Sequence, residues 1–533
     1  MAHADDREAG RADVCLVLEG TYPYVKGGVS TWVHDLIKSL PDLRFTLVHI
    51  GPEPGAYAWS YYALPENVVA LTDLYCRAPA ERGPDRAARI RAARAERRRH
   101  SAPRRPSRLL EGIRRLHLDE ASDGSLLDDL AARDLTPSAF LHGRATYDVV
   151  TDLYERLAPD ASFLDFYWHC RSMHLPIVRL LDTEPPAAGV YHALCTGYAG
   201  LLAAAWSRRT GSPFLLTEHG IYARERSLEL DRAAWIERSH VRGRNGNRAA
   251  APTDAATAAA LRTMWTRFFR VLARCAYAQA SNVVSLCEVS RQKQIADGAP
   301  AERTLVVPNG IDVEEFRAHA RAATPPAQRP PSKEPRTTRV GFVGRLVPIK
   351  DLATFIRACY LALQVVDLDV RIIGPVDEDP RYARRCRRLA AKFGVERAIR
   401  FEGTLPVERV YPEIDVLVLT SFSEGQPLVI LEAGAAGIPV VASDVGACRE
   451  LLEGRSDEDR AIGPSGIVTR LAAPEETAAA IAGLARDPEK RRLMGAAGRR
   501  RVTTFYRKSA TVSTYLSLYT SASWPASAGA SNA

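Results

Sequence analysis

The sequence predicts an α/β protein with two Rossmann-like domains, and three observations support this. Short apolar runs without polar alternation recur along the chain, which is typical of strands buried on both faces of a parallel sheet. Helical patterns separate these runs; the clearest covers residues 352–363, with apolar side chains at positions i, i+3, i+4, i+7 and i+11. Five prolines within residues 318–338 then divide the runs into two groups.

Each group of apolar runs predicts one parallel sheet. The expected strands are residues 14–18, 45–50, 190–194, 214–217, 283–286 and 304–307 before the break, and residues 340–343, 370–373, 399–401, 416–419 and 440–442 after it. In open sheets of this class, ligands bind at the carboxyl ends of the strands. We therefore expect a ligand cleft between two domains that face each other.

The composition and the helical patterns set the expected domain boundaries. We expect an N-terminal domain over 1–325 with an insertion at 77–145, a Pro-rich linker over 326–338, a C-terminal domain over 339–500, a helix over 501–519 and a disordered tail over 520–533. The tail residues are small and polar, which disfavours a packed structure.

The positive charge is concentrated in residues 77–115, the first part of the insertion, and the formal net charge of the chain is +9. Residues 77–115 contain fourteen Arg and four acidic residues, a balance of +10, so the rest of the chain sums to −1. Such a run can attract phosphate-rich partners or an anionic membrane. However, it contains no Phe, Trp or Tyr, and single-stranded nucleic-acid sites need aromatic platforms. We interpret it as a solvated Arg-rich insertion without a specific nucleic-acid partner; an anionic contact is the alternative.

Cysteine usage and the N-terminus point to the cytoplasm. The nine cysteines are odd in number, form no C-x-x-C motif and sit partly in apolar runs, as Cys15 does, which indicates buried thiols in a reducing compartment. The N-terminus is polar and lacks the apolar segment of a signal peptide. The apolar stretches fall short of the ~18 residues that a membrane span needs. Recruitment to the cytoplasmic face of the membrane stays open.

Two motifs mark the first domain. Gly27 and Gly28 lie between the first strand and a helix, where paired glycines let backbone N–H groups approach an anion; a tight turn is the alternative. The motif is not G-x-G-x-x-G, so no dinucleotide site is indicated. His219 follows the strand 214–217 and is placed to bond a substrate hydroxyl or transfer a proton, although spacing alone favours an imidazole with a structural role.

The second domain opens with a candidate diphosphate clamp. Gly344, Arg345 and Lys350 lie between a buried strand and the start of a helix. Two cations at this position can neutralise a departing diphosphate, an effect of the order of 10²–10³-fold in rate, and the helix N-terminus adds N–H donors. The alternative is a pair of exposed loop cations with surface partners.

Two glutamates, Glu424 and Glu432, form the last motif. Glu424 precedes a predicted helix and Glu432 lies on it, about 12 Å further along if the segment is helical. This is about the reach from a nucleotide ribose to a sugar beyond the diphosphate. Pro427 fits the first helical turn, and the phosphates would meet free N–H groups of the surrounding segment, which consists of Gly425, Gln426, Pro427 and Leu428. The alternative is one loop acid and one acid on the helix surface.

Together and in this order, the motifs resemble glycosyltransferase family 4, the retaining enzymes with the two-domain GT-B fold. The resemblance is carried by Gly27-Gly28, by Pro-Asn-Gly-Ile-Asp at 308–312, by Gly344-Arg345-Leu346 with Lys350, and by the E-x₇-E pair Glu424/Glu432. The opening segment 18–33, Leu-Glu-Gly-Thr-Tyr-Pro-Tyr-Val-Lys-Gly-Gly-Val-Ser-Thr-Trp-Val, is similar to the PelF-like group, which acts in Pel exopolysaccharide synthesis.

The resemblance implies a hexosyltransferase that uses a UDP-sugar, with UDP-glucose as the first candidate, and a glycan or lipid-linked acceptor. Arg345 and Lys350 would bind the diphosphate. Glu432 would bind the ribose hydroxyls and Glu424 the donor sugar. His219 would contact the sugar near the reaction centre, and Gly27 and Gly28 would let the acceptor and the diphosphate approach. The uracil would bind near residues 403–405.

The resemblance also implies that the reaction needs few chemical groups from the protein. Front-face transfer helped by the leaving phosphate needs no protein nucleophile, and neither a cofactor nor a metal is expected. Asp367-Leu-Asp369 matches the metal-binding D-x-D motif of the other transferase fold, but we interpret this as coincidence. The helix over 501–519 would cross back to the first domain. The resemblance does not explain the Arg-rich insertion: either it docks the enzyme to an inner-membrane polysaccharide synthase complex that serves biofilm formation, or it has no specific role.

Two other classes of function stay open. A UDP-sugar 2-epimerase would share the fold and the nucleotide site, although the Glu424/Glu432 pair with Lys350 favours transfer. A binding protein would act through residues 77–115 on nucleic acid or another anion, or would be a catalytically dead subunit.

Overall fold

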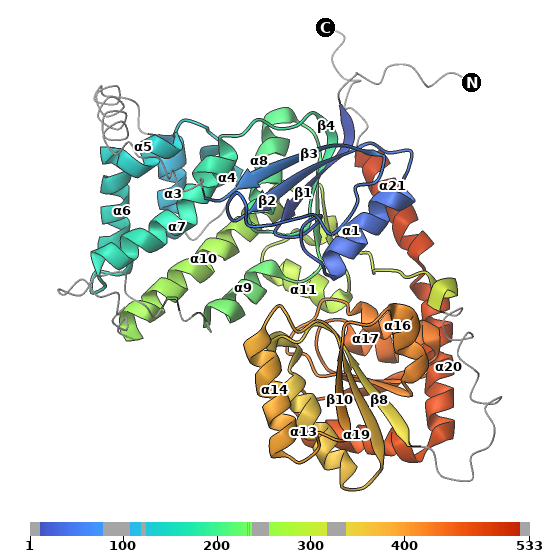
Figure 1. Ribbon diagram of the computed structural model, residues 1–533. Coiled ribbons are helices and arrows are strands. Elements are labelled where there is room, and N and C mark those ends of the chain that lie inside the picture. Colours follow the sequence, from blue (N-terminus) through green and yellow to red (C-terminus); the bar gives the residue numbers. More distant parts are fainter. Residues whose placement is uncertain are drawn as a thin grey trace, which may run out of the picture. The chain divides into compact units, whose positions relative to one another are not determined.

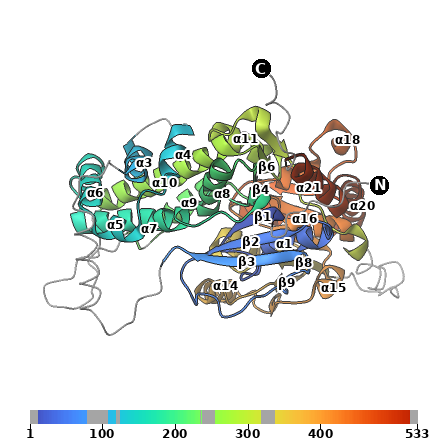
Figure 2. The same ribbon diagram turned by 90° about the horizontal axis from the view of Figure 1, so that it is seen from above.

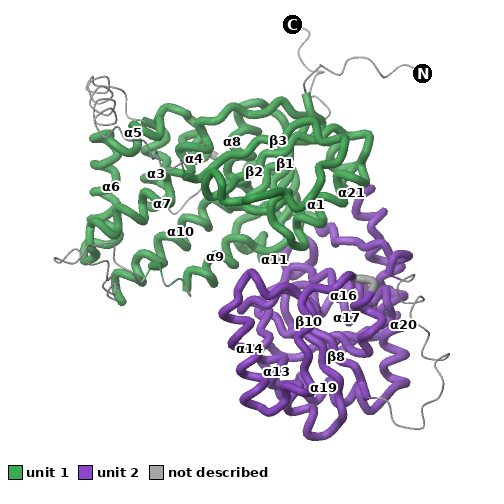
Figure 3. Tube along the Cα trace, in the orientation of Figure 1, with its two compact units in different colours: residues 1–285, 291–305, 515–533 green, residues 286–290, 306–514 purple. Residues whose placement is uncertain are grey.

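The computed structural model describes residues 11–77, 107–118, 124–231, 233, 235–236, 255–316 and 337–522 (Figure 1). Most of the Arg-rich run, most of the expected linker and the end of the tail lie outside the described residues. The chain divides into two compact units: unit 1 is 1–285, 291–305 and 515–533, and unit 2 is 286–290 and 306–514 (Figure 3). Each unit contains a parallel sheet with helices, so the predicted pair of Rossmann-like α/β domains is confirmed.

The sheet of unit 1 has seven strands in the order β3-β2-β1-β4-β5-β6-β7. They are β1 (Ala12–Glu19), β2 (Phe45–Gly51), β3 (Val68–Tyr75), β4 (Ala188–Ala193), β5 (Phe214–Glu218), β6 (Asn282–Ser285) and β7 (Thr304–Val306). The order reverses between β1 and β4, where Val14 pairs with Phe45 on one side and Val190 on the other. Crevices at such reversal points bind ligands in this fold class.

Helices cover this sheet and fill a long connection between β3 and β4. The helices α1 (Gly28–Ser39), α8 (Tyr198–Thr210), α9 (Tyr222–Asp231), α10 (Ala255–Gln279) and α11 (Glu288–Ala296) follow strands or join them. The connection holds α3 (Arg108–Leu118), α4 (Gly124–Leu130), α5 (Pro137–His142), α6 (Arg144–Leu157) and α7 (Phe163–Leu181), so its helices continue well past residue 145. They gather with α10 into a helical group beside the sheet (Figure 2).

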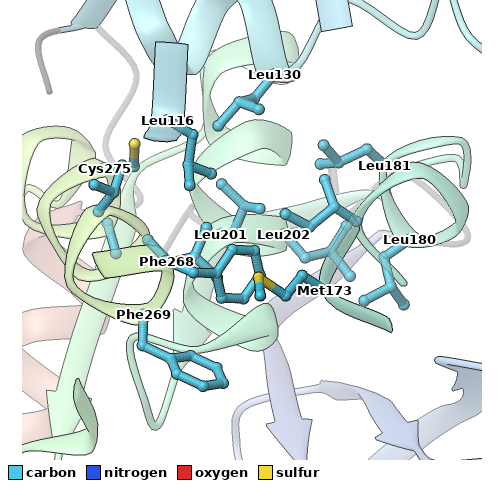
Figure 4. Close-up of a cluster of buried hydrophobic side chains, with 14 of the residues drawn as sticks. Leu116, Leu130, Met173, Leu180, Leu181, Leu201, Leu202, Phe268, Phe269 and Cys275 are labelled. Carbon is cyan, nitrogen blue, oxygen red and sulfur yellow. The ribbon is translucent and has the colours of Figure 1, made fainter. Parts of the chain in front are cut away.

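One apolar core joins this helical group to the sheet. Leu116 of α3, Met173 of α7, Leu202 of α8 and Phe268 of α10 are all completely buried in it (Figure 4). Burying a side chain of this size contributes about 1.5–3 kcal/mol. The long connection is therefore part of the packed unit.

The sheet of unit 2 has six strands in the order β10-β9-β8-β11-β12-β13. They are β8 (Thr338–Val343), β9 (Leu368–Ile373), β10 (Ile399–Gly403), β11 (Val416–Leu419), β12 (Val440–Ser443) and β13 (Gly466–Thr469). Its helices are α13 (Leu352–Leu363), α14 (Pro380–Lys392), α15 (Val407–Val410), α16 (Leu428–Ala436), α17 (Cys448–Glu453), α18 (Asp457–Arg460), α19 (Pro474–Arg486) and α20 (Pro488–Phe505). A further helix, α21 (Lys508–Ala522), begins in unit 2 and ends in unit 1. The strand order reverses between β8 and β11.

The segment expected as one helix over 501–519 is divided between α20 and α21, with Tyr506 and Arg507 between them. Residues from Tyr515 onward belong to unit 1. There the hydroxyl of Tyr519 lies 2.8 Å from Nδ1 of His192, and the hydroxyl of Tyr515 lies 3.0 Å from Oγ1 of Thr217. The C-terminal residues of α21 thus complete the polar core of the first unit.

All nine cysteines are free thiols, and seven of them are buried. Burial raises the pKa values of buried thiols such as Cys15 far above their usual range, so these thiols stay protonated and unreactive. Among the described helices, none is both long enough and apolar enough to cross a membrane.

Candidate functional site

The predicted site residues of unit 2 gather where its strand order reverses. Gly344 and Lys350 follow β8, and the segment from Thr420 to Pro427 follows β11, its neighbour in the sheet. Both segments therefore lie at the carboxyl edge of the sheet, beside the reversal point.

Lys350 and Glu424 form an ion pair. Nζ of Lys350 lies 2.6 Å from Oε1 of Glu424, and the side chains are 19% and 10% exposed, respectively. The hydroxyl of Ser421 donates to the same carboxylate oxygen at 2.6 Å. Within the described residues no donor reaches Oε2 of Glu424, so one carboxylate oxygen is held and the other is available to a ligand.

Hydrogen bonds join the two loops independently of this ion pair. Oγ1 of Thr420 donates to the carbonyl of Asp351 at 2.9 Å, and the N–H of Phe422 donates to the carbonyl of Ile349 at 2.8 Å. The carboxylate of Asp351 in turn accepts from the N–H of Thr354 and caps α13. The loops thus place Lys350 beside Glu424 before any ligand arrives, which is preorganisation of the kind that catalysis needs.

Glu432 projects from α16 and accepts a hydrogen bond from the hydroxyl of Tyr411. Burial raises the pKa of Glu432 above its ordinary value, whereas the hydrogen bond from Tyr411 lowers it. The pKa of Tyr411 is well above its usual range because the hydroxyl is buried and faces this carboxylate. Tyr411 thus satisfies a carboxylate that lies in an apolar stretch of sequence, which needed a partner.

Gln426 connects this loop to the Pro-Asn-Gly-Ile-Asp motif of residues 308–312. Its Oε1 accepts from the N–H of Asn309 at 2.5 Å, and both residues are buried. Oδ1 of Asn309 is a buried oxygen without a hydrogen-bond partner in the described part of the chain. The sequence pointed to both motifs, but not to their contact.

Glycines permit close backbone packing at this edge of the sheet. Gly374, which follows β9, has a φ of +149°, and a Cβ there would lie 1.9 Å from the carbonyl oxygen of Gly344. Gly446 has a φ of +52°, and a Cβ there would lie 2.1 Å from the carbonyl oxygen of Glu424. The N–H of Ala447 donates to the carbonyl of Gly425 at 2.8 Å, which holds this contact. Larger residues at these glycines would displace the site loops.

The N-terminus of α16 is open to an anion. The sequence suggested that Pro427 lies in the first turn of this helix. The helix begins at Leu428 instead, so Pro427 is its N-cap residue. No side chain caps the helix there. The first N–H groups of a helix have no partner within it, and the helix dipole favours negative charge at this end.

Among the described residues, neither Arg345 nor the segment 403–405 makes a hydrogen bond or ion pair with Lys350 or Glu424. Arg345 pairs with Glu378, with Nη1 2.7 Å and 2.9 Å from its two carboxylate oxygens, and both side chains are exposed. Such a surface pair contributes at most about 1 kcal/mol, so a diphosphate can replace Glu378 at little cost. Gly403 ends β10 and its carbonyl accepts from the N–H of Gly374, at the same edge of the sheet.

The Asp367-Leu-Asp369 segment has a structural role. Asp369 lies in β9, and both of its carboxylate oxygens accept from Nη2 of Arg400 at 2.7 Å. Among the residues that the structure describes, no cluster of three or more His, Cys, Asp or Glu side chains is arranged to hold a metal ion.

The predicted residues of unit 1 lie at the carboxyl edge of its own sheet. Gly27 is the uncapped N-cap residue of α1, and a Cβ on Gly27 or Gly28 would meet open space. His219 packs edge-on against Trp32 at 4.7 Å, and its Nε2 is buried without a hydrogen bond in the described chain. Burial lowers the pKa of His219 to about 4, so the imidazole is neutral near pH 7.

A buried carboxylate beside His219 was missed in the sequence. Glu218 accepts hydrogen bonds from Thr196 at 3.0 Å, from Tyr277 at 2.6 Å and from Gln294 at 3.1 Å. Burial raises the pKa of Glu218, and these hydrogen bonds lower it. Glu218 thus fixes the backbone that carries His219. The Thr-Glu-His-Gly sequence placed it at the strand end, but its partners come from three distant segments.

Comparison with family models divides the chain in the same way. Residues 12–302 match the model described as "Domain of unknown function (DUF3492)". Residues 337–487 match the model described as "Glycosyl transferases group 1". The second match contains the complete set of unit 2 site residues described above, apart from Asn309.

Curated relatives match less than half of the chain. A D-inositol 3-phosphate glycosyltransferase of Geodermatophilus obscurus is 32% identical over 251 residues, which cover 45% of this chain and 52% of the relative. A protein of the same description from Nocardia farcinica is 31% identical over 220 residues, 40% of this chain and 46% of the relative. The chain thus spans about half the length of the curated relatives it matches.

Solved structures share the fold over nearly the whole chain. HepE from Anabaena in complex with UDP and glucose has a TM-score of 0.55 and 14% identity, and the match covers 96% of this chain and 100% of that one. Sucrose-phosphate synthase from Thermosynechococcus elongatus has a TM-score of 0.54 and 16% identity, with 95% and 98% covered. These likenesses show a GT-B fold. The chain belongs to the family described as Domain of unknown function (DUF3492), and its second unit carries a glycosyl transferases group 1 domain.

Proposed function

We propose that this protein is a retaining glycosyltransferase that moves a hexose from a UDP-sugar to a glycan or lipid-linked acceptor. The observation that carries the proposal is the preorganised Lys350–Glu424 ion pair at the strand reversal of a glycosyl transferases group 1 domain. UDP-glucose is the first donor to test, and the product is a Pel-like extracellular polysaccharide, as in the PelF-like group.

In the proposed donor site, two cations bind the diphosphate, and backbone N–H groups and carboxylates form hydrogen bonds with the rest of the donor. Lys350 binds the diphosphate and neutralises the charge that develops as UDP leaves, and Arg345 joins it by exchanging Glu378 for phosphate oxygens. The open N-terminus of α16 supplies N–H donors to the same phosphates. Glu432 accepts hydrogen bonds from the ribose hydroxyls, and Oε2 of Glu424 accepts a hydrogen bond from a hydroxyl of the donor sugar.

The transfer itself needs one bond exchange. The bond between the anomeric carbon and the phosphate oxygen breaks, and a bond from that carbon to the acceptor oxygen forms on the same face of the sugar. The acceptor's hydroxyl proton passes to the departing phosphate oxygen, so UDP leaves with both electrons of the broken bond. No redox partner takes part, and the proposal includes no metal and no cofactor.

Two groups of unit 1 serve the sugars. The neutral imidazole of His219 is suited to a hydrogen bond with a sugar hydroxyl, because its pKa of about 4 leaves it uncharged at neutral pH. The space beside Gly27 and Gly28 admits the acceptor and the diphosphate.

The comparisons support the nucleotide more than the acceptor. HepE from Anabaena has been solved with UDP, with UDP and glucose, and with UDP-glucose, which favours UDP-glucose as the first donor. The curated relatives act on D-inositol 3-phosphate by their description, which makes this compound a second acceptor to test. We further propose that the enzyme is cytoplasmic and docks to an inner-membrane polysaccharide synthase complex.

The experiment measures UDP release from a panel of UDP-hexoses and UDP-N-acetylhexosamines, with and without glycan, lipid-linked and D-inositol 3-phosphate acceptors. We expect acceptor-dependent UDP release with one donor, an α-linked product by NMR, and loss of release in Lys350→Ala. Conversion of the UDP-sugar to its 2-epimer without any acceptor would instead establish the epimerase. No turnover of any UDP-sugar would contradict the proposal.

A further inference from the structure

A pocket of about 820 Å³ lies in unit 1, and its lining includes none of the residues proposed for the donor. Four segments line it: α1 (His34 and Lys38), the turn from α1 to β2 (Pro41, Asp42 and Arg44), the connection between β2 and β3 (Ala63, Pro65, Glu66 and Asn67), and Val69 of β3. Its volume is within the range of about 300–1,000 Å³ that is usual for small-ligand sites.

The charged groups of this pocket balance each other. Lys38, Asp42, Arg44 and Glu66 line it. Within the described residues, none of these four side chains makes an ion pair or a hydrogen bond. An anionic ligand would meet the two acids, and a cationic ligand would meet the two bases. A neutral ligand with many hydroxyls satisfies both, because each hydroxyl donates and accepts.

Two exposed aromatic rings lie on the same connection, toward the other end of α1. Trp59 is 62% exposed and Tyr61 is 45% exposed, and their rings stand nearly perpendicular at 77° with centroids 6.0 Å apart. The N–H of Tyr61 donates to the carbonyl of Pro23 at 3.0 Å, and Nζ of Lys26 lies 5.0 Å from the ring centroid. This corner is held in place, and its apolar faces fit the C–H face of a pyranose ring.

Tyr62 joins the aromatic corner to the pocket. Its hydroxyl lies 3.1 Å from Oγ1 of Thr31 on α1, and its ring centroid lies 5.3 Å from that of His34, which lines the pocket. Asn67 then ties the connection to the end of α1 by donating to the carbonyls of Ile37 and Leu40. The twelve residues of α1 span about 18 Å, so a ligand that reaches both ends is a chain of several sugars.

We propose that the aromatic corner, Tyr62 and the pocket together bind a neutral oligosaccharide, namely a remote segment of the acceptor chain. We call this surface the α1 strip; it comprises Trp59, Tyr61, Tyr62, Lys38, Arg44 and Glu66. The inference rests on the proposed function, since that function gives the protein a saccharide chain to hold. The α1 strip makes the enzyme favour long acceptors by keeping the chain bound between transfers.

The test measures binding by the full chain with calorimetry and with tryptophan fluorescence. The probes are neutral hexasaccharides and disaccharides of glucose, galactose and their N-acetylamino forms, in α- and β-linked series, with a sulfated hexasaccharide as the anionic comparison. The variants are Trp59→Ala and Glu66→Gln, both at exposed positions, and the matched control is Trp168→Ala, an exposed tryptophan on α7.

We expect one neutral hexasaccharide series to bind at least about tenfold more tightly than its disaccharide, and each variant to lose about tenfold in hexasaccharide affinity while the control loses none. UDP affinity, measured in parallel, should be equal in all four proteins. If UDP binds and no neutral hexasaccharide does, the inference fails and the proposed function survives. Equal hexasaccharide affinity in wild type and variants, or preference for the sulfated probe, would also overturn the inference.

Discussion

Lys350 and Glu424 are 74 residues apart in the chain, yet Nζ and Oε1 lie 2.6 Å from each other. The contact forms because β8 and β11 are neighbours at the strand reversal and because hydrogen bonds from Thr420 and Phe422 join their two loops. Ser421 donates to the same oxygen of Glu424 that pairs with Lys350, which fixes the position of this oxygen. The Lys350 side chain is therefore positioned, and it is still partly exposed. This is the arrangement expected of a charge that must meet a diphosphate.

The first prediction concerns Lys350. In Lys350→Ala, kcat/KM for donor-dependent UDP release should fall by roughly 10²–10³-fold, because the charge that develops on the leaving diphosphate loses its cation. Lys392→Ala, at an exposed lysine of α14, is the control and should leave the rate unchanged. A Lys350→Ala/Glu424→Gln double variant should lose far less than the sum of the single effects, since the two groups act together. If the double variant instead lost the sum of the two single effects on kcat/KM, Lys350 and Glu424 would act independently, which would contradict the prediction.

The second prediction uses Tyr411, whose hydroxyl donates to Glu432. Burial already raises the pKa of Glu432, and Tyr411→Phe removes a hydrogen bond that lowers it, so the pKa rises further. Since ribose binding needs the ionised carboxylate, UDP affinity in the variant should begin to fall at a higher pH as the solution is acidified. UDP titrations across the acid and neutral range measure this. Tyr360→Phe, a ring stacked on Phe393 in the same unit, should show the wild-type profile.

The third prediction separates steric and backbone effects at glycine. Gly374→Ala combines a φ of +149° with a Cβ placed 1.9 Å from the carbonyl oxygen of Gly344. Gly394→Ala has a φ of +70° and open space around the Cβ. The latter should cost about 1 kcal/mol of backbone strain, and the former clearly more, with weaker UDP binding as well. Urea unfolding and UDP titration give both quantities, and equal costs would refute the close packing at Gly344.

The fourth prediction concerns a buried ion pair of unit 2. Nε of Arg501 lies 2.5 Å from Oδ1 of Asp459, and both side chains are buried. Arg501→Met leaves Asp459 as an uncompensated buried charge and should lower the free energy of unfolding by about 3–5 kcal/mol. The adjacent exposed Arg500→Met should change it by less than about 0.5 kcal/mol. A small effect of Arg501→Met in urea unfolding would mean that water reaches the pair.

The sequence predicted the central strands because they are buried on both faces, as Val14 and Val340 are. It also predicted the edge strands β7 and β10, but it missed the other two edge strands, β3 and β13. In β3 most side chains are partly or fully exposed, so polar residues such as Asp73 interrupt the apolar run. β13 has only four residues and begins with a glycine. The exposure of β3 removes the continuous apolar signal that identifies strands buried on both faces.

Site residues that act within one loop were visible in the sequence, whereas their partners were not. The spacing of Glu424 and Glu432 indicated a functional pair. Nothing in it indicated that Tyr411 would donate to Glu432 or that Asn309 would donate to Gln426, because tertiary folding creates these contacts. Arg345 shows the reverse case: its motif placed it beside a diphosphate, and the structure shows its present partner, the exposed Glu378.

The central claim is that unit 2 holds a uridine nucleotide with Glu432 on its ribose. Calorimetric titration with UDP, ADP and GDP on wild type and Glu432→Ala tests it most directly. The account predicts micromolar binding of UDP, much weaker binding of ADP and GDP, and loss of UDP binding in the variant. Wild-type protein that binds none of the three nucleotides, or a Glu432→Ala variant that binds UDP as tightly as wild type, would contradict it.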